Sequence, residues 1–361
     1  MANKEKVTVI GAGNIGTLMA AEIAVRGYDV CLYAHSKDNI SGELSVFDAD
    51  DALLYSTKLK KVTDKLETAL EEADFVFVTY PSFMLGGLCE QMLPLIRKEA
   101  AVCIVPGSGG AEFAFKPLID KGVTLCGLQR VHSIARLKQK GKSVYMLGRK
   151  DSVQLGAIPS RKTAELSQLV GNMLSMPCEA LENYLSVTLT PSNPILHTTR
   201  LYSMFRDWHE GVYYPENIPF YESWTDNSSR ELFACDEELQ EICKALSPLD
   251  LSAVRSLKLH YESDTPEKLT AKIKSIKAFR GILSPMKETK NGFIPDLESR
   301  YFTADFPYGL KVLIEFGKAT GIDTPNMNKV WSWYLSLSPE AEKNCFVLPD
   351  SMADKITDFY K

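Results

Sequence analysis

The sequence KVTVIGAGNIG at residues 6–16 decides the fold of the first half of this chain. Its apolar first half is typical of a buried strand, and the apolar positions of residues 15–23 recur at the spacing of a helix. Between these elements, Gly11 permits a sharp turn, Gly13 lets the backbone approach a pyrophosphate, and Gly16 lets the helix pack on the strand. The stretch therefore predicts a strand, a turn and a helix that bind a dinucleotide.

A dinucleotide bound at this turn lies on the first backbone N–H groups of the helix, where the helix dipole favours negative charge. We therefore expect it to contact Gly11, Gly13, Asn14, Ile15 and Gly16. A structural turn without a ligand is the alternative, because a lone GxGxxG pattern is a weak signal. The position of the pattern between a predicted strand and a predicted helix favours binding.

The second predicted strand, residues 29–34, is followed by His35, Ser36 and Lys37. Sites that prefer NAD usually have an acid here, which bonds the ribose hydroxyls. A hydroxyl and a cation suit a 2′-phosphate better, so the sequence favours NADP, with these three residues at the adenosine ribose. Because Asp38 follows directly after them, NAD remains the alternative cofactor.

Strand and helix patterns alternate further along the chain, which indicates an α/β sheet. Two of the predicted strands lead into turns at the edge where such sheets bind ligands, beyond the carboxyl ends of the strands. The turn residues that we expect at the cofactor are Tyr80, Pro81, Gly107 and Ser108. For the glycine-rich turn at residues 106–110, a plain tight turn is the alternative.

After about residue 178 the strand signals mostly stop and helical periodicity takes over. The sequence therefore predicts an α/β Rossmann-type dinucleotide-binding domain over residues 1–178, followed by an all-α helical domain over residues 179–361. The length of 361 residues fits two domains.

The composition is that of an ordinary globular protein, with 45% hydrophobic and 24% charged residues and a formal net charge of -5. This mild acidic balance gives no electrostatic reason to expect nucleic acid or a membrane as a partner. We find no apolar stretch with the length of a membrane span and no signal-peptide pattern. Eight scattered cysteines without a CxxC pair indicate reduced thiols in a cytoplasmic protein, and no metal site.

The second half contains two polar motifs. Asn193 followed by Pro194 predicts a helix start with Asn193 as its cap, and His197 then lies one turn on, on the same face. A second helix is predicted to begin near Asp305, with Arg300 in the preceding loop. Taken alone, such residues are more often caps, surface charges or packing residues than catalytic groups.

Between the two motifs, eight aromatic residues lie from Tyr202 to Trp224. Rings with polar tips can build the wall of a small-molecule pocket, but packing between helices explains them better. The stretches that follow have the spacing of ordinary amphipathic helices.

In this order and at this distance, the two polar motifs resemble those of the opine dehydrogenase family of the octopine and nopaline dehydrogenase type. Residues 193–197, NPILH, look like the family's Asn-Pro-x-x-His helix start, and residues 300–305, RYFTAD, look like its Arg-x4-Asp segment. The resemblance runs over nearly the whole chain. The glycine turn is shared with many unrelated dehydrogenases, whereas the two motifs are not.

The resemblance implies an oxidoreductase that acts on CH–NH donors with NADP or NAD. Its substrates would be a pyruvate-like α-keto acid and the amino group of an amino acid, which form an imine that NAD(P)H reduces. The family's catalytic histidine falls on His197, the acid that orients it on Asp305 and the arginine that binds the keto acid on Arg300. A residue that shapes the site falls on Asn193.

Two other functions stay open at this point. A ketopantoate-type reductase has a similar first domain and reduces a 2-keto acid to a hydroxy acid, but its base is a lysine, and no lysine of this chain stands in an equivalent motif. A regulatory protein that binds NADP without turnover is the other alternative. The sequence also leaves a homodimer open.

Overall fold

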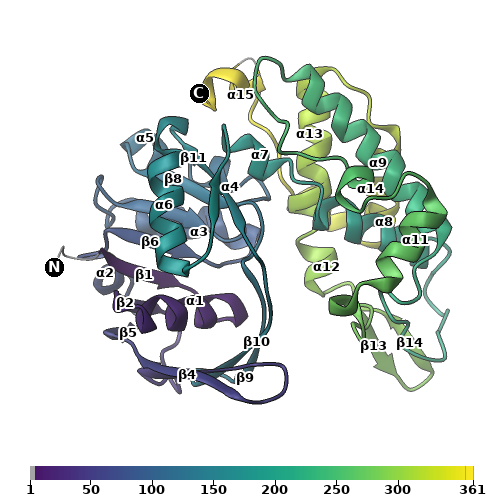
Figure 1. Cartoon of the computed structure of the whole chain (residues 1–361). Coiled ribbons are helices and arrows are strands. Elements are labelled where there is room, and N and C mark those ends of the chain that lie inside the picture. Colours follow the sequence, from purple (N-terminus) through teal and green to yellow (C-terminus); the bar gives the residue numbers. More distant parts are fainter. Residues whose placement is uncertain (1–4, 354, 361) are drawn as a thin grey trace. The chain divides into compact units, whose positions relative to one another are not determined.

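The computed structural model describes residues 5–353 and 355–360. The chain divides into two compact units, of which the first runs up to Thr188 and includes Tyr360, and the second is Leu189–Phe359 (Figure 1). Each unit is described by itself below.

Eight strands form the main sheet of the first unit, in the order β12-β11-β8-β7-β6-β1-β2-β5. Their bounds are Lys6–Ile10 (β1), Asp29–Tyr33 (β2), Lys61–Thr63 (β5), Phe75–Val78 (β6), Ala101–Ile104 (β7), Thr124–Leu128 (β8), Val153–Ile158 (β11) and Cys178–Ala180 (β12). The strands from β8 to β5 are parallel to their neighbours, whereas β11 runs antiparallel to β8. The predicted α/β sheet is confirmed, with a mixed edge.

The strand order defines where this sheet can bind a ligand. From β1 the chain builds outward through β2 and β5 on one side, and through β6, β7 and β8 on the other. The order therefore reverses between β1 and β6, and open α/β sheets bind ligands beyond the carboxyl ends of the strands at such a switch point.

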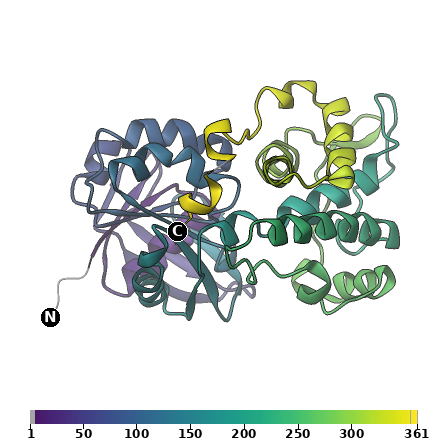
Figure 2. The same ribbon diagram turned by 90° about the horizontal axis from the view of Figure 1, so that it is seen from above.

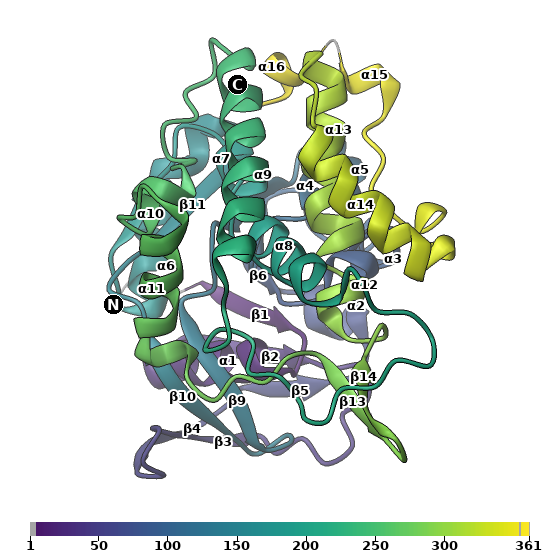
Figure 3. The same cartoon turned by 90° about the vertical axis from the view of Figure 1, so that its right-hand side faces the viewer.

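The helix after the glycine turn, α1 (Asn14–Val25), is buried on both sides. Besides the main sheet, it contacts a second sheet of order β4-β3-β10-β9 (Figure 3). The bounds of these strands are Glu43–Phe47 (β3), Leu53–Lys58 (β4), Ser133–Gln139 (β9) and Ser143–Arg149 (β10). Because both faces are covered, the helix is apolar nearly all round rather than amphipathic.

Further helices complete the first unit. They are α2 (Leu66–Leu70), α3 (Leu85–Met92), α4 (Ala111–Ala114), α5 (Lys116–Lys121), α6 (Thr163–Leu174) and α7 (Leu185–Thr188). The domain boundary after residue 178 stays a prediction. The compact unit continues beyond that residue because the buried hydroxyl of Tyr184 donates to the carbonyl oxygen of Gly107, 2.8 Å away.

Tyr360 belongs to the first unit through a buried carboxyl group. Its hydroxyl and that of Thr188 both donate to Oε1 of Glu112, each at 2.5 Å. Burial raises the pKa of Glu112 to about 7. The penultimate residue of the chain is therefore held by a hydrogen bond to the α/β unit.

A second buried carboxylate ties α1 to the small sheet. Glu22 accepts hydrogen bonds from His132, at 2.5 Å, and from Arg149. Burial opposes the charge of Glu22, but the hydrogen bond from His132 and the charges of both partners outweigh it, so the pKa of Glu22 is lowered.

Helices make up most of the second unit (Figure 2), and one hairpin joins them. Its helices are α8 (Asn193–Phe205), α9 (Asp226–Ala245), α10 (Leu257–His260), α11 (Pro266–Ser275), α12 (Arg300–Thr303), α13 (Lys311–Thr320), α14 (Pro325–Leu337), α15 (Asp350–Ala353) and α16 (Ile356–Phe359). Among the described residues, no helix is long and apolar enough to cross a membrane.

The hairpin adds two strands to the expected all-α domain. It consists of β13 (Met286–Thr289) and β14 (Gly292–Pro295). A two-residue loop joins them, and Gly292 after it has a φ of 126°, which favours glycine. The pair Asn291-Gly292 is a known hairpin signal that sequence analysis passed over.

We predict that Glu22→Gln lowers the free energy of unfolding at neutral pH by about 3 kcal/mol, the scale for removing one partner of a buried ion pair. The difference in free energy of unfolding between the wild type and the variant is fully present above the ordinary glutamate pKa of 4.5. It is lost as the pH falls through the lowered pKa that Glu22 has in the folded state. Urea unfolding at stepwise lower pH measures it, with Glu90→Gln on the exposed side of α3 as the control. A difference that stays constant with pH would contradict the assignment.

Candidate active site

His197 and Asp305 form a hydrogen-bonded pair in the second unit. Oδ2 of Asp305 lies 2.8 Å from Nδ1 of His197, although the two residues are 108 positions apart. A carboxylate can only accept, so Nδ1 carries a proton and donates it to Asp305. Both side chains are largely buried.

The start of α8 sets the position of His197. Ser192 occupies the cap position and Asn193 is the first helical residue, so the expectation that Asn193 caps the helix is wrong. Pro194 lies within the first turn, where a missing N–H costs nothing. Gly309 packs on this proline so closely that an added Cβ would lie 3.2 Å from its Cα.

Asp305 precedes a π-helical turn at Phe306–Leu310, whose N–H at Leu310 donates to the carbonyl oxygen of Asp305 at 2.8 Å. Turns of this kind are frequent at functional sites. Arg300 opens the short helix α12, which corrects the expectation that it lies in a loop. Its side chain is exposed. The structure thus places Arg300 one turn before the carboxylate.

Aromatic rings surround the imidazole of His197. The Tyr301 ring lies 4.6 Å from it, centroid to centroid, and the Phe220 ring meets it edge-on at 5.5 Å. The hydroxyl of Tyr221 lies 3.0 Å from Nε2. In the sequence, only the aromatic density of its segment marks Tyr221.

A buried arginine holds the Tyr221 segment against α8. Arg200 donates from Nε to the carbonyl oxygen of Phe220 at 2.9 Å and from Nη2 to that of Ser223 at 2.8 Å. Its guanidinium also lies over the Trp224 ring. Burial lowers the pKa of Arg200 to about 10, so it remains charged at neutral pH.

In the first unit, the glycine turn has the shape that a pyrophosphate requires. Gly11 has a φ of 113°, and a Cβ at Gly16 would lie 1.8 Å from the Gly11 carbonyl oxygen. A Cβ at Gly13, by contrast, would meet no atom of the described chain within 4 Å, so this side of the turn is open. Tyr80 follows β6 and lies beside Gly11, where it would be 3.2 Å from an added Cβ.

Other residues expected at the cofactor have partners within the protein. Oδ1 of Asn14 accepts from the backbone N–H of Leu137 at 2.8 Å. Ile15 packs against the core of the unit. Gly107 is needed for packing, since its Cβ would meet Gly127 Cα at 2.8 Å. Pro81 and Ser108 are half-buried at their turns.

The segment after β2 is exposed and polar. Ser36 donates to a carboxylate oxygen of Asp38 at 3.3 Å, and Lys37 Nζ lies 3.2 Å from Oδ1 of Asp64. The hydrogen bond from Lys37 holds the pKa of Asp64 below its usual value. His35 is exposed as well.

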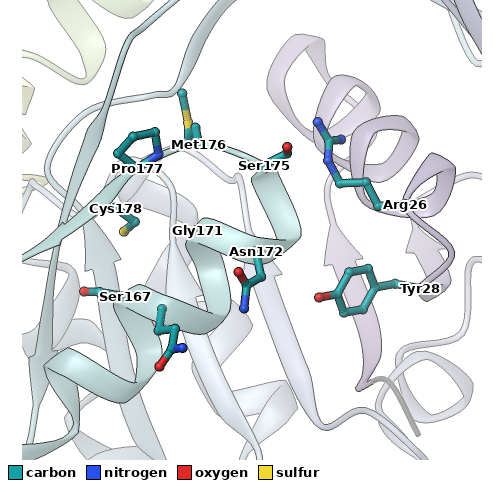
Figure 4. A pocket seen from close by; sticks show the side chains of 10 residues that line it. Arg26, Tyr28, Ser167, Gly171, Asn172, Ser175, Met176, Pro177 and Cys178 are labelled. Carbon is teal, nitrogen blue, oxygen red and sulfur yellow. The ribbon is translucent and has the colours of Figure 1, made fainter. Parts of the chain in front are cut away.

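A pocket of about 840 Å³ lies elsewhere on the first unit (Figure 4). Arg26 and Tyr28 line it on one side, and residues of α6 from Ser167 onward, with the residues up to Cys178, line the other. Because the glycine turn is at the opposite end of α1, this pocket is separate from the dinucleotide turn.

A Rossmann-type sheet with an open glycine turn, together with a histidine held by a carboxylate on a helical unit, defines a two-domain NAD(P)-dependent dehydrogenase. Two family models match this chain. Residues 180–338 match the alpha-helical domain of NAD/NADP octopine/nopaline dehydrogenase, and residues 6–154 match the N-terminus of NAD-dependent glycerol-3-phosphate dehydrogenase. The helical half of the chain thus matches the octopine/nopaline dehydrogenase domain, and the chain is similar to opine dehydrogenases, as the sequence motifs predict.

Relatives of the family align with nearly the whole chain. Octopine dehydrogenase of Pecten maximus is 25% identical, over 91% of this chain and 89% of the relative. Opine dehydrogenase of Haliotis discus hannai is 28% identical, over 92% and 90%. A solved structure of octopine dehydrogenase with NADH and pyruvate matches with a TM-score of 0.80 at 25% identity, over 92% of this chain and 89% of that chain.

We predict that alanine substitutions at two glycines of the turn affect different properties, dinucleotide binding at one glycine and stability at the other. Gly13→Ala should keep wild-type stability and weaken dinucleotide binding, because the new Cβ points into the open side of the turn. Gly16→Ala should cost roughly 1–3 kcal/mol of stability, because the new Cβ meets backbone. Thermal unfolding and fluorescence titration with NADH and NADPH separate the two effects. Equal destabilisation by both substitutions would contradict this assignment.

Proposed function

We propose that this protein joins a pyruvate-like α-keto acid to the amino group of an amino acid and reduces the resulting imine to a secondary amine. The observation that carries the proposal is the His197–Asp305 pair at 2.8 Å in a chain whose helical half matches this family. Support for the substrate class comes from octopine dehydrogenase, whose structures contain NADH with pyruvate or with L-arginine.

His197 is the proposed general acid and base. A carboxylate that accepts from Nδ1 fixes the tautomer of the imidazole and stabilises the imidazolium. Nε2 is then the nitrogen that can exchange a proton. When the amine has added to the keto group, protonated His197 can supply the proton with which the hydroxyl leaves as water. Asp305 is the residue that orients it.

Arg300 and Asn193 are proposed to contact the substrate. The planar guanidinium of Arg300 can hold the carboxylate of the keto acid through two parallel hydrogen bonds. Asn193 lies on the same helix as His197, one turn earlier, and can shape the site with its amide group. Both side chains are exposed and thus available to a ligand.

The turn residues of the first unit fit a dinucleotide, because Gly13 is open and the first N–H groups of α1 are close to it. The reduced nicotinamide supplies the hydride. We propose a preference for NADP, supported by Ser36 and Lys37. The ammonium group of Lys37 already pairs with the carboxylate of Asp64. A 2′-phosphate would take the place of this carboxylate as the anionic partner of Lys37.

The eight free thiols of the chain support a reducing compartment, for which we propose the cytoplasm. Burial raises the pKa of seven of these thiols, which makes them poor nucleophiles.

The reaction is tested by following NADPH and NADH oxidation with pyruvate, alone and with a panel of amino acids. We expect turnover only when keto acid and amino acid are both present. Reduction of the keto acid alone, unchanged by any amine, would show a simple keto-acid reductase instead. Cofactor binding without turnover under all conditions would show a regulatory protein.

The catalytic role of His197 is tested in the same assay. His197→Gln should lower kcat by about 10² to 10⁴, the range for loss of a general acid or base. His209→Gln is the matched control, because His209 is an exposed histidine of the same unit. Full activity of His197→Gln would show that another group moves the proton.

We predict that Lys37→Ala raises the KM for NADPH about tenfold, equivalent to 1.4 kcal/mol, and leaves the KM for NADH unchanged. The reason is that only NADPH carries the 2′-phosphate. Lys60→Ala serves as the control, since Lys60 is also an exposed lysine paired with an aspartate near β2. Equal effects on the two cofactors would remove the argument for NADP.

A further inference from the structure

The atom of His197 that must exchange a proton is covered by a side chain of the protein. With Nδ1–H donated to Asp305, Nε2 is the remaining site for proton transfer. The hydroxyl oxygen of Tyr221 lies 3.0 Å from this nitrogen. When the imidazole is neutral, the Tyr221 hydroxyl donates to Nε2, and when it is charged, Nε2–H donates to the hydroxyl oxygen.

The Tyr221 ring is held firmly in this position. It stacks on the ring of Phe279, with centroids 4.0 Å apart and planes 15° from parallel, and lies nearly parallel to Trp224 at 6.3 Å. Arg200 fixes the backbone on both sides of it, through the carbonyl oxygens of Phe220 and Ser223. The hydroxyl therefore cannot leave Nε2 by a simple side-chain rotation.

The hydroxyl also keeps its proton. Burial raises the pKa of Tyr221, and nearby Tyr301, Tyr261 and Asp305 act in the same direction. A hydroxyl that stays protonated can donate one proton while it accepts another, whereas a phenolate could only accept. A group that passes a proton from one residue to another must donate one proton while it accepts another.

We propose that Tyr221 relays the proton between Nε2 of His197 and the reacting group of the substrate. The inference rests on the proposed function, in which His197 is the acid and base. It makes Tyr221 a further catalytic residue, and Phe279 and Arg200 the residues that position it.

The relay balances at the step in which water leaves. The carbon–oxygen bond of the carbinolamine breaks, and its electron pair goes to the departing oxygen. Tyr221 gives its hydroxyl proton to that oxygen, which forms water, and takes the proton of Nε2–H from His197. The amine lone pair forms the carbon–nitrogen double bond, so the positive charge passes from the imidazolium to the iminium ion, and His197 is left neutral.

The test is Tyr221→Phe, which removes the hydroxyl and keeps the stacked ring. We expect kcat to fall by about a hundredfold or more, because proton transfer by a side chain contributes on the order of 10²–10⁴. The KM for NADH and NADPH should stay within a factor of about two. Tyr214→Phe is the matched control, since Tyr214 is a tyrosine of the same unit that packs on Phe205, away from His197.

A proton inventory separates a relay from a structural role. The rate of a single turnover is measured in mixtures of H₂O and D₂O for the wild type and for Tyr221→Phe. Two protons in flight give a curved dependence on the deuterium fraction for the wild type, and the variant should give a straight line. Thermal unfolding of the variant shows whether its fold is kept.

The relay is overturned by wild-type kcat in Tyr221→Phe, by a straight line for the wild type, or by a curve that the substitution leaves unchanged. Failure of the proposed function looks different. In that case His197→Gln retains activity, or turnover requires no amine, whatever Tyr221→Phe does.

Discussion

The hydrogen bond between Asp305 and His197 is the constraint on which the helical unit depends. Its two residues come from distant parts of the chain, so the start of α8 and the π-helical turn must meet within 2.8 Å. The close contact of Gly309 on Pro194 makes this approach possible. A proline that starts the helix and a glycine that lets another backbone reach it are therefore as necessary to the pair as the imidazole and the carboxylate.

The two glycine-rich turns of the first unit show that similar sequences can serve different purposes. At Gly13 nothing in the described chain opposes a side chain, so packing within the unit does not explain the glycine. At Gly107 the neighbours are Gly127, Tyr184 and Val187, so packing alone explains it. A glycine after a strand thus indicates a cofactor only when the space beside it is open, and this distinction needs three-dimensional structure.

Elements that depend on local interactions could be predicted from the sequence. The unit of β1, turn and α1 is set by neighbouring residues, and its prediction from residues 6–16 is confirmed. The hairpin at residues 286–295 was missed because helical periodicity on either side outweighed a short turn signal. The contact of Tyr221 with His197 could not be predicted from the sequence, since it depends on a backbone path that Arg200 holds and that no spacing along the chain records. The roles proposed for His197, Arg300 and Asp305 come from family motifs rather than from periodicity.

Arg200 also has a consequence for how such an enzyme can change during evolution. It binds the segment beside the histidine through main-chain carbonyl oxygens, and these are the same whatever side chains the segment carries. Substitutions there can alter the wall of the site without releasing the segment from α8. The side chains of the segment can therefore diverge while its backbone keeps its place beside the histidine.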